Sequence, residues 1–222
     1  KGVDDTYYTV EEYKEKVKAA QTDKHDKIVM LYTNTPQEHD HLIEACRSRG
    51  YDVLIFDNVI DNHFMQHLEM KLGDVTFVRV DSDTVDNLVQ KDEKQESVLS
   101  EDEEPSVKTV FEGLVTEAGG TVVLKAMSPE DLPVQITRPE FMRRMKEMQT
   151  LQGMGMGDFP DSYNVVINSN HPLIADKLLK AEEGAARNEI AAYLLNLARL
   201  NQNMLKGSQL TAFINKSLEF MK

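Results

Sequence analysis

Tryptophan is absent from this chain of 222 residues, and cysteine occurs once, at Cys46. A single cysteine excludes an internal disulfide framework and is typical of a protein from a reducing compartment. Cys46 falls within a helical pattern, where we expect it to be a small buried side chain. A reactive thiol is the alternative at this position.

Positive charge and long apolar runs are also scarce. The 25 Lys and Arg are outnumbered by 38 Asp and Glu, which gives a net charge of −13. Because phosphate binding needs an excess of Lys and Arg, we expect no nucleic-acid partner. No run of eighteen apolar residues is present, so we expect no membrane partner. No signal-peptide pattern is present and residue 1 is Lys, so we expect a cytoplasmic location and a chain that is processed or part of something longer.

Sequence motifs for catalysis are weak. Residues 32–36 (Tyr-Thr-Asn-Thr-Pro) follow an apolar run but form neither a dinucleotide fingerprint nor a P-loop. Ser128 and Ser169 lie in turn-like stretches, outside any G-x-S-x-G elbow. We therefore predict no catalytic residue, no cofactor-binding residue and no enzymatic activity within these residues.

Histidine is the remaining candidate for a metal site. His63 and His67 are four residues apart and share a helical face, and His39 and His41 lie two apart near a helix start. Zinc sites need three or four ligands, and no further ligand accompanies either pair. We therefore expect no bound metal and interpret these histidines as surface residues.

Short apolar runs alternate with helical patterns over residues 1–80. Runs at 27–32, 52–56 and 75–80 are typical of buried strands, and helical patterns separate them. Thr9 and Thr35 are predicted N-caps, the latter with Pro36 at the first helical position, and glycines at 50 and 73 end two helices. This alternation predicts a small α/β domain with a parallel sheet.

Residues 81–104 are strongly acidic. They contain ten Asp or Glu against two Lys, a local charge of −8 within the total of −13. Such a stretch repels itself and buries little apolar surface, which predicts a mobile or partly helical linker. An acidic binding tail is the alternative.

Residues 105–222 mix helical and strand patterns and predict an α+β domain. Strands are expected at 121–126, 134–137 and 163–168, and helices at 105–115, 140–149 and 172–179. Glycines at 119 and 120 are expected to close the first of these helices.

Residues 185–222 predict a helical hairpin that dimerises the chain. The first helix is apolar around nearly its whole circumference, so it must be covered on all sides, and Gly207 and Ser208 are expected to end it and to cap the second. A second copy of the hairpin would complete a four-helix bundle. The alternative is a hairpin that docks on its own domain. The predicted dimerisation residues are Leu194, Leu197, Leu205, Leu210, Phe213, Ile214 and Leu218.

Methionine is concentrated between residues 142 and 156. An apolar stripe along the helix at 140–149 runs into a segment in which three glycines alternate with methionine. Flexible thioethers on a flexible backbone make an adaptable apolar surface for varied partners. Ordinary core packing is the alternative, and it explains Met142 and Met145 better than Met154 and Met156.

Four stretches resemble one known family. They are residues 50–56 (Gly-Tyr-Asp-Val-Leu-Ile-Phe), 141–146 (Phe-Met-Arg-Arg-Met-Lys), 167–174 (Ile-Asn-Ser-Asn-His-Pro-Leu-Ile) and 193–200 (Tyr-Leu-Leu-Asn-Leu-Ala-Arg-Leu). In this order they are similar to segments of the ninety-kilodalton heat-shock chaperone family, of the bacterial HtpG type. Ser169 stands where the family has proline.

The resemblance implies the end of the family's middle domain, a linker and the C-terminal dimerisation domain. The family's ATP and magnesium site and its catalytic arginine lie in parts that this chain does not contain. The chain should therefore be a dimerising, client-binding piece of a stress-response chaperone that hydrolyses ATP when intact. Its expected partners are a second copy and non-native client proteins. A small-ligand-binding regulatory or enzyme subunit that uses the α/β domain is the alternative.

The resemblance also implies where clients bind. His63 stands where bacterial relatives place Trp, and Phe64 lies beside it. The eukaryotic Met-Glu-Glu-Val-Asp tail, which co-chaperones read, is absent. The client-binding residues carried over are His63, Phe64, Met145, Met148, Leu151, Met154, Met156 and Phe159.

Overall fold

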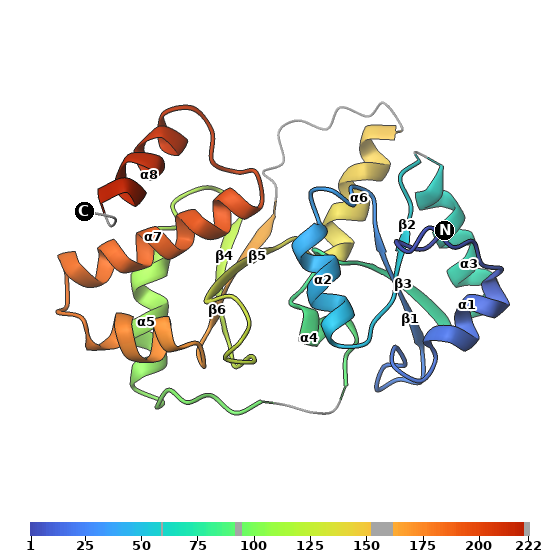
Figure 1. The fold of residues 1–222 in the computed structure, drawn as a ribbon, viewed down its shortest axis with the longest axis horizontal. Helices are drawn as coiled ribbons and strands as arrows, with labels where there is room; N and C mark the ends of the chain where they lie inside the picture. The colour runs from blue at the N-terminus through green and yellow to red at the C-terminus, as the bar shows by residue number, and fades with distance from the viewer. Residues whose placement is uncertain (59, 92–94, 152–161, 220–222) are drawn as a thin grey trace. The chain divides into compact units, whose positions relative to one another are not determined.

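The chain folds into two compact units (Figure 1). The computed structural model describes the backbone of residues 1–58, 60–91, 95–151 and 162–219, and the side chains of all these except 147–151. The first unit comprises Lys1–Glu93 and Arg138–Gly157, and the second comprises Lys94–Thr137 and Asp158–Lys222. The helix expected at 140–149 therefore belongs with the first unit, although the sequence pattern placed it in the domain from 105 to 222.

A three-stranded parallel sheet forms the centre of the first unit, as the sequence predicted. Its order is β2-β1-β3, from β1 (Ile28–Thr33), β2 (Val53–Ile55) and β3 (Val75–Arg79). The register places Leu31 opposite Val53 and also opposite Val78. The helices of this unit are α1 (Val10–Val17), α2 (Asp40–Ser48), α3 (Asp61–Leu72), α4 (Val85–Leu88) and α6 (Glu140–Leu151).

Both faces of this sheet are covered. Val29 and Leu31 point to one face, where they pack with α2 and α4, and Met30 and Tyr32 point to the other, where they pack with α1 and α3. Successive side chains of a strand alternate between faces, so a strand buried on both sides must be apolar throughout. All six residues of β1 are buried, and this explains its continuous apolar run.

Helix ends in the first unit partly follow the predicted caps. Thr9 caps α1, because its Oγ1 accepts the Glu12 N–H at 3.2 Å while the Glu12 carboxylate accepts the Thr9 N–H at 2.8 Å. Gly73 ends α3 at φ 71°, a left-handed position that suits glycine. The prediction for Thr35 and Pro36 was wrong: residues 36–39 form a turn, and α2 begins at Asp40 with His39 at its N-cap.

The start of the predicted acidic linker is folded. Val85, Leu88 and Val89 are buried and pack with α2, and α4 carries the first two. Their spacing of i, i+3 and i+4 places them on one helical side, so their burial outweighs the repulsion between neighbouring acids. Asp81 and Ser82 are buried as well.

The second unit contains a mixed sheet of order β4-β6-β5, which agrees with the predicted α+β class. β6 (Tyr163–Asn168) is central, with β4 (Gly120–Lys125) parallel and β5 (Val134–Thr137) antiparallel to it. Its helices are α5 (Glu103–Glu112), the π-helix η1 (Leu173–Leu178), α7 (Ala185–Asn201) and α8 (Gly207–Glu219).

Two predicted helix ends in this unit were wrong. α5 ends at Glu112 with Gly113 as its C-cap, so the glycines at 119 and 120 do not close it. α7 ends at Asn201, and Gly207, with φ 56°, is the first residue of α8. Ser208 therefore lies within α8 and does not cap it.

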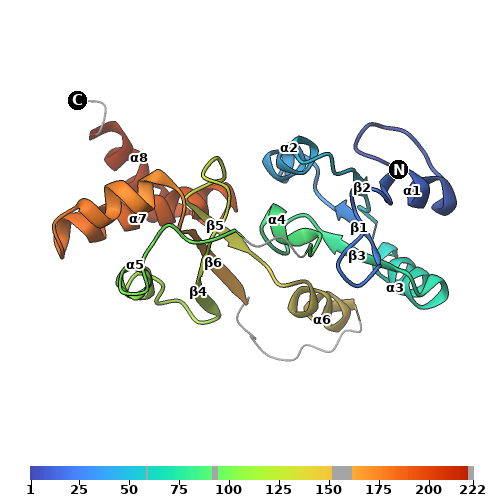
Figure 2. The ribbon, with the colours of Figure 1, turned by 90° about the horizontal axis from the view of Figure 1, so that it is seen from below.

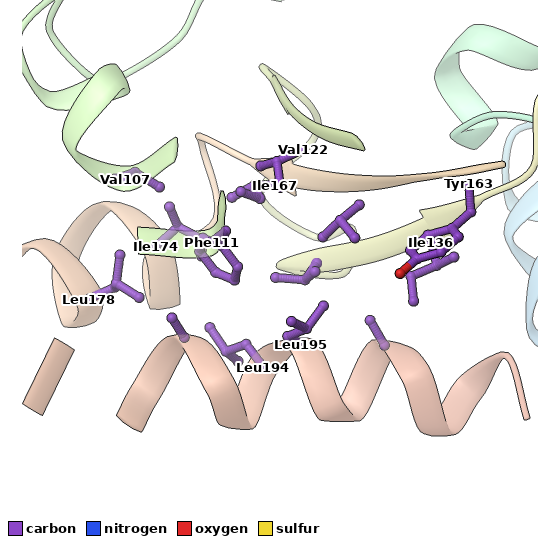
Figure 3. Close-up of a cluster of buried hydrophobic side chains, with 14 of the residues drawn as sticks. Val107, Phe111, Val122, Ile136, Tyr163, Ile167, Ile174, Leu178, Leu194 and Leu195 are labelled. Atoms are coloured by element: carbon purple, nitrogen blue, oxygen red, sulfur yellow. The ribbon is translucent and has the colours of Figure 1, made fainter. Parts of the chain in front are cut away.

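The core of the second unit lies between its sheet and α5, η1 and α7 (Figures 2 and 3). Phe111 of α5 and Ile167 of β6 are fully buried, and Leu194 and Leu195 of α7 face them across the core (Figure 3). One side of α7 is therefore covered by its own unit. This is what we expected of the alternative in which the hairpin docks on its own domain.

Candidate functional site

Helix α6 packs against the sheet and α3 of the first unit through charged side chains. Arg144 Nη1 lies 2.9 Å from Glu69 Oε2 on α3, and Arg144 Nη2 donates to the Phe77 carbonyl oxygen at 2.6 Å. Arg144 Nε also lies 2.6 Å from Glu140 Oε1 one turn earlier. Burial alone would lower the pKa of the Arg144 guanidinium, but the Glu69 and Glu140 carboxylates more than offset it and the pKa is raised.

The second half of this contact is centred on Tyr32 of β1. The Tyr32 hydroxyl donates to Glu140 Oε1 at 3.1 Å and accepts a short hydrogen bond from Arg143 Nη2. Arg143 Nη2 also lies 2.5 Å from Glu140 Oε1. Burial raises the pKa of Tyr32, and the negative charge of Glu140 raises it further, so the hydroxyl stays protonated. Glu140, Arg143 and Tyr32 together hold α6 by hydrogen bonds and charge.

Three apolar side chains on the described part of α6 are exposed to solvent. Phe141 is 74% exposed, Met142 39% and Met145 41%, whereas Arg143 and Arg144 are largely buried. A helix on the surface of a globular protein normally has the opposite orientation, with apolar residues inward. Of the predicted client-binding residues, Met145 therefore lies on an exposed apolar face. Met148 and Leu151 are on the same helix, but their side chains are outside the described residues.

Helix α3 carries the next candidates, and Arg144 links it to α6. His63 is exposed, and Phe64 is 45% exposed with its ring centroid 6.4 Å from that of Phe56. Ile60 and Met70 at the two ends of α3 are 70% and 79% exposed. The predicted residues Met154, Met156 and Phe159 lie outside the described residues, so their role stays a prediction.

The predicted dimerisation residues differ in their exposure. Leu194, Leu205 and Phe213 are buried within the chain's own unit. Phe213 packs on Tyr193 of α7, with ring centroids 5.2 Å apart. Leu210 is half-buried. The exposed members are Leu197 at 41%, Ile214 at 49% and Leu218 at 54%, and Leu200 of α7 adds a further apolar side chain at 40%.

A buried polar cluster at the ends of β1 and β3 was missed by the sequence analysis. Asp81 is 1% exposed and accepts two hydrogen bonds from Arg79, Nε to Oδ1 at 2.5 Å and Nη2 to Oδ2 at 2.7 Å. His39 Nδ1 lies 2.8 Å from Thr33 Oγ1, and its Nε2 lies 3.9 Å from Asp81 Oδ2. His39 is therefore buried, and its interpretation as a surface residue was wrong. The sequence pattern did place His39 near the start of a helix, and this was the only feature that could have indicated its burial.

His39 should make the first unit less stable as the pH falls. Burial lowers the pKa of its imidazole below the ordinary 6.5, although the Asp81 carboxylate partly opposes this. The unfolded chain then binds the proton more readily, so stability is full above pH 6.5 and is lost as the pH falls toward the folded pKa. We expect His39→Gln to flatten the dependence of the melting temperature on pH between 7 and 5.

The matched control for this measurement is His63→Gln, because His63 is exposed on α3. The control should retain the wild-type slope of melting temperature against pH. Equal slopes for wild type and His39→Gln would contradict a role for His39.

The Asp81 carboxylate affects stability in a separate, lower range of pH. Burial raises its pKa, but Arg79 more than offsets this and holds the pKa below 3.8, so its contribution is lost only in stronger acid.

Comparison with known proteins shows which family this chain belongs to. The family model described as Hsp90 protein matches residues 2–218. The chain belongs to the Hsp90 family. The resemblance found in the four sequence stretches is therefore confirmed.

Three relatives of this Hsp90 chain are bacterial proteins. It is 38% identical over 213 residues to the chaperone protein HtpG of Bacteroides thetaiotaomicron, an alignment that covers 93% of the chain and 31% of that relative. It is 32% identical to HtpG of Bacteroides fragilis strain YCH46, covering 98% of the chain and 42% of the relative. It is 37% identical to HtpG of Porphyromonas gingivalis ATCC 33277, covering 90% and 30%. The chain thus spans less than half the length of these relatives.

Two further findings concern the cysteine of this Hsp90 chain and its helices. Cys46 is fully buried, as expected, and burial raises the pKa of its thiol to about 12, which disfavours the thiolate. Within the part of the chain that the structure describes, no helix is both long and apolar enough to cross a membrane.

Proposed function

We propose that this chain is the part of an Hsp90-type chaperone that binds non-native polypeptides and pairs with a second copy of itself. The observation that carries the proposal is the reversed orientation of α6, with charged residues inward and Phe141, Met142 and Met145 outward. Fixing three large apolar side chains in water has no benefit for the fold, because their burial would stabilise it. An exposed apolar face of this kind marks a site for a protein partner.

The second part of the proposal concerns α7 and α8. Leu197, Leu200, Ile214 and Leu218 stay exposed after Leu194 and Phe213 have packed within the unit. A two-fold interface would use the same residues on both chains and bury them together. Two client-binding faces in one particle would then act at high effective concentration, so that weak apolar contacts together hold a client.

The activity of the whole protein follows the same proposal. ATP and magnesium would be bound by parts of the longer protein outside this chain, and ATP hydrolysis would take place there, in the cytoplasm. The alternative of a small ligand at the ends of β1 and β3 has less support. Ligands of open α/β sheets bind at the carboxyl ends of strands, and here Arg79, Asp81 and His39 occupy that position and contact one another.

Replacing Phe141 and Met145 together by Ser should strongly weaken client holding. The assay is light scattering from a denatured model protein that aggregates alone and is suppressed by the wild-type chain. We expect the double variant to lose most of this suppression while its melting temperature changes little, because exposed side chains contribute within about 0.5 kcal/mol to stability. Leu132→Ser is the control, since Leu132 is 48% exposed in the second unit. Unchanged suppression by the double variant would contradict the proposal.

A further inference from the structure

Among the residues that the structure describes, strand β3 lies at the edge of the first sheet, and about half of its main-chain groups face away from β1. The Ile28 N–H donates to Asp74 O at 2.8 Å, and the Val80 N–H donates to Tyr32 O at 3.0 Å. Residues 74 and 80 therefore face β1, and alternate residues along a strand face opposite edges. The N–H and C=O groups of Phe77 and Arg79 point outward, where a fourth strand would pair.

Side chains occupy the position of that missing strand. The Phe77 N–H donates to Glu69 Oε1 at 2.7 Å, and the Phe77 carbonyl accepts from Arg144 Nη2 at 2.6 Å. The Arg79 N–H donates to Glu140 Oε2 at 3.2 Å. These are an alternating set of donors and acceptors, as a neighbouring strand would provide. Natural proteins protect sheet edges from pairing with other chains, and here α6 supplies two of the three protecting groups.

Charged side chains hold this protection in place. Glu140 and Arg144 are each about a fifth exposed, so solvent and salt reach their ion pairs. On the described part of α6, Phe141 is 74% exposed, and Met142 and Met145 are 39% and 41% exposed, so this helix is not held mainly by its apolar side chains. Once α6 leaves, the Phe77 carbonyl and the Arg79 N–H lose their side-chain partners and are open to pairing with water or with another main chain.

We propose that the outer edge of β3 binds an extended polypeptide as an added strand, and that α6 is its removable cover. The inference rests on the proposed function and assigns a second, distinct contact for the same non-native clients. Main-chain pairing suits such clients because every polypeptide has the same backbone groups, whatever its sequence. The bound segment would be extended and would replace the bonds of Glu140 and Arg144, and that of Glu69 where it pairs with Phe77.

The test is the anisotropy of a fluorescein-labelled, uncharged peptide in which Val and Thr alternate, titrated with the full chain. The variant Glu140→Gln with Arg144→Gln releases the cover. We expect it to bind the peptide at least about fivefold more tightly than wild type, because the docked state competes with the peptide. Amide hydrogen exchange at Phe77 and Arg79 should slow when the peptide is bound.

Matched controls separate this site from the apolar face of α6. The same peptide with alternate backbone nitrogens methylated should lose its binding, since it cannot donate to the edge. Phe141→Ser with Met145→Ser should leave peptide binding unchanged even where it abolishes suppression of aggregation. Should the release variant fail to fold, wild type is titrated at rising salt, which should strengthen binding of the uncharged peptide. Equal binding of the methylated peptide, or no gain on release by either route, would overturn the proposal.

Discussion

Replacing Ile214 and Leu218 together by Asp should convert a two-chain particle into single chains. Both side chains are about half exposed in the isolated chain, so their replacement leaves its own core intact. In a two-fold interface each chain would instead bury two unpaired carboxylates. Breaking a buried contact in this way costs at least about 4 kcal/mol, so the dissociation constant should rise about a thousandfold or more. Light scattering after gel filtration at several dilutions measures the mass.

The control adds the same charge elsewhere on α8. Ser208 and Ala212 are also exposed and four residues apart, and at 100° per residue they lie on a different side of the helix. Replacing both by Asp should preserve the mass of two chains. A wild-type chain that is a monomer at every dilution, or a dimer that survives Ile214→Asp with Leu218→Asp, would reject the proposed interface.

Phe213 is a poorer position for this experiment, although the apolar stripe includes it. It is 7% exposed and packs on Tyr193, so Phe213→Asp would disrupt the hairpin itself. Loss of the dimer could then come from local unfolding of the hairpin or from loss of the interface, and this experiment would not distinguish the two. Exposed residues of the same helix separate these two causes.

Phe111→Ala should lower the stability of the second unit by about 3–5 kcal/mol, the usual loss when a buried phenylalanine leaves a cavity. Phe111 is fully buried between α5, the sheet and α7 (Figure 3). The first unit has cores of its own, so its free energy of unfolding should change little. Native-state hydrogen exchange in dilute urea, read separately for residues of each unit, measures both values.

The reciprocal substitution is Phe77→Ala. Phe77 is 1% exposed and packs edge-on against Phe56, with ring centroids 5.6 Å apart. It should destabilise the first unit and leave the second largely unchanged. Equal losses in both units from either substitution would show that the chain unfolds as one cooperative body, contrary to the expectation from separate cores.

Strand and helix patterns could be read from the sequence because local chemistry decides them. A run such as residues 28–32 is buried on both faces of the sheet, so its side chains must be apolar whatever else the chain does. The capping box at Thr9 involves residues three apart and can be recognised without knowledge of the fold. Thr35 and Pro36 present an equally good local signal, but the chain turns there and α2 starts later with His39.

The position of α6 could not be read from the sequence, because the bonds that decide it are long-range. Glu140 pairs with Tyr32 and with the N–H of Arg79, and Arg144 pairs with Glu69. A stripe of methionines beside two arginines predicts an amphipathic helix, but periodicity does not state which side faces the protein. Likewise Leu194 and Leu197 share one apolar helix, and the sequence cannot distinguish a side chain buried in its own core from one that a second chain would cover.

The path of the chain through β5 and β6 has a consequence for folding. These strands pair directly, with Thr137 opposite Asn164, yet the connection between them contributes α6 to the other unit. Each doubling of a loop's length adds only about 0.6 kcal/mol to the entropy of closing it, so this long excursion weakens the strand pair little. The ladder between β5 and β6 contains no residue of α6, so we expect it to form whether or not α6 is docked.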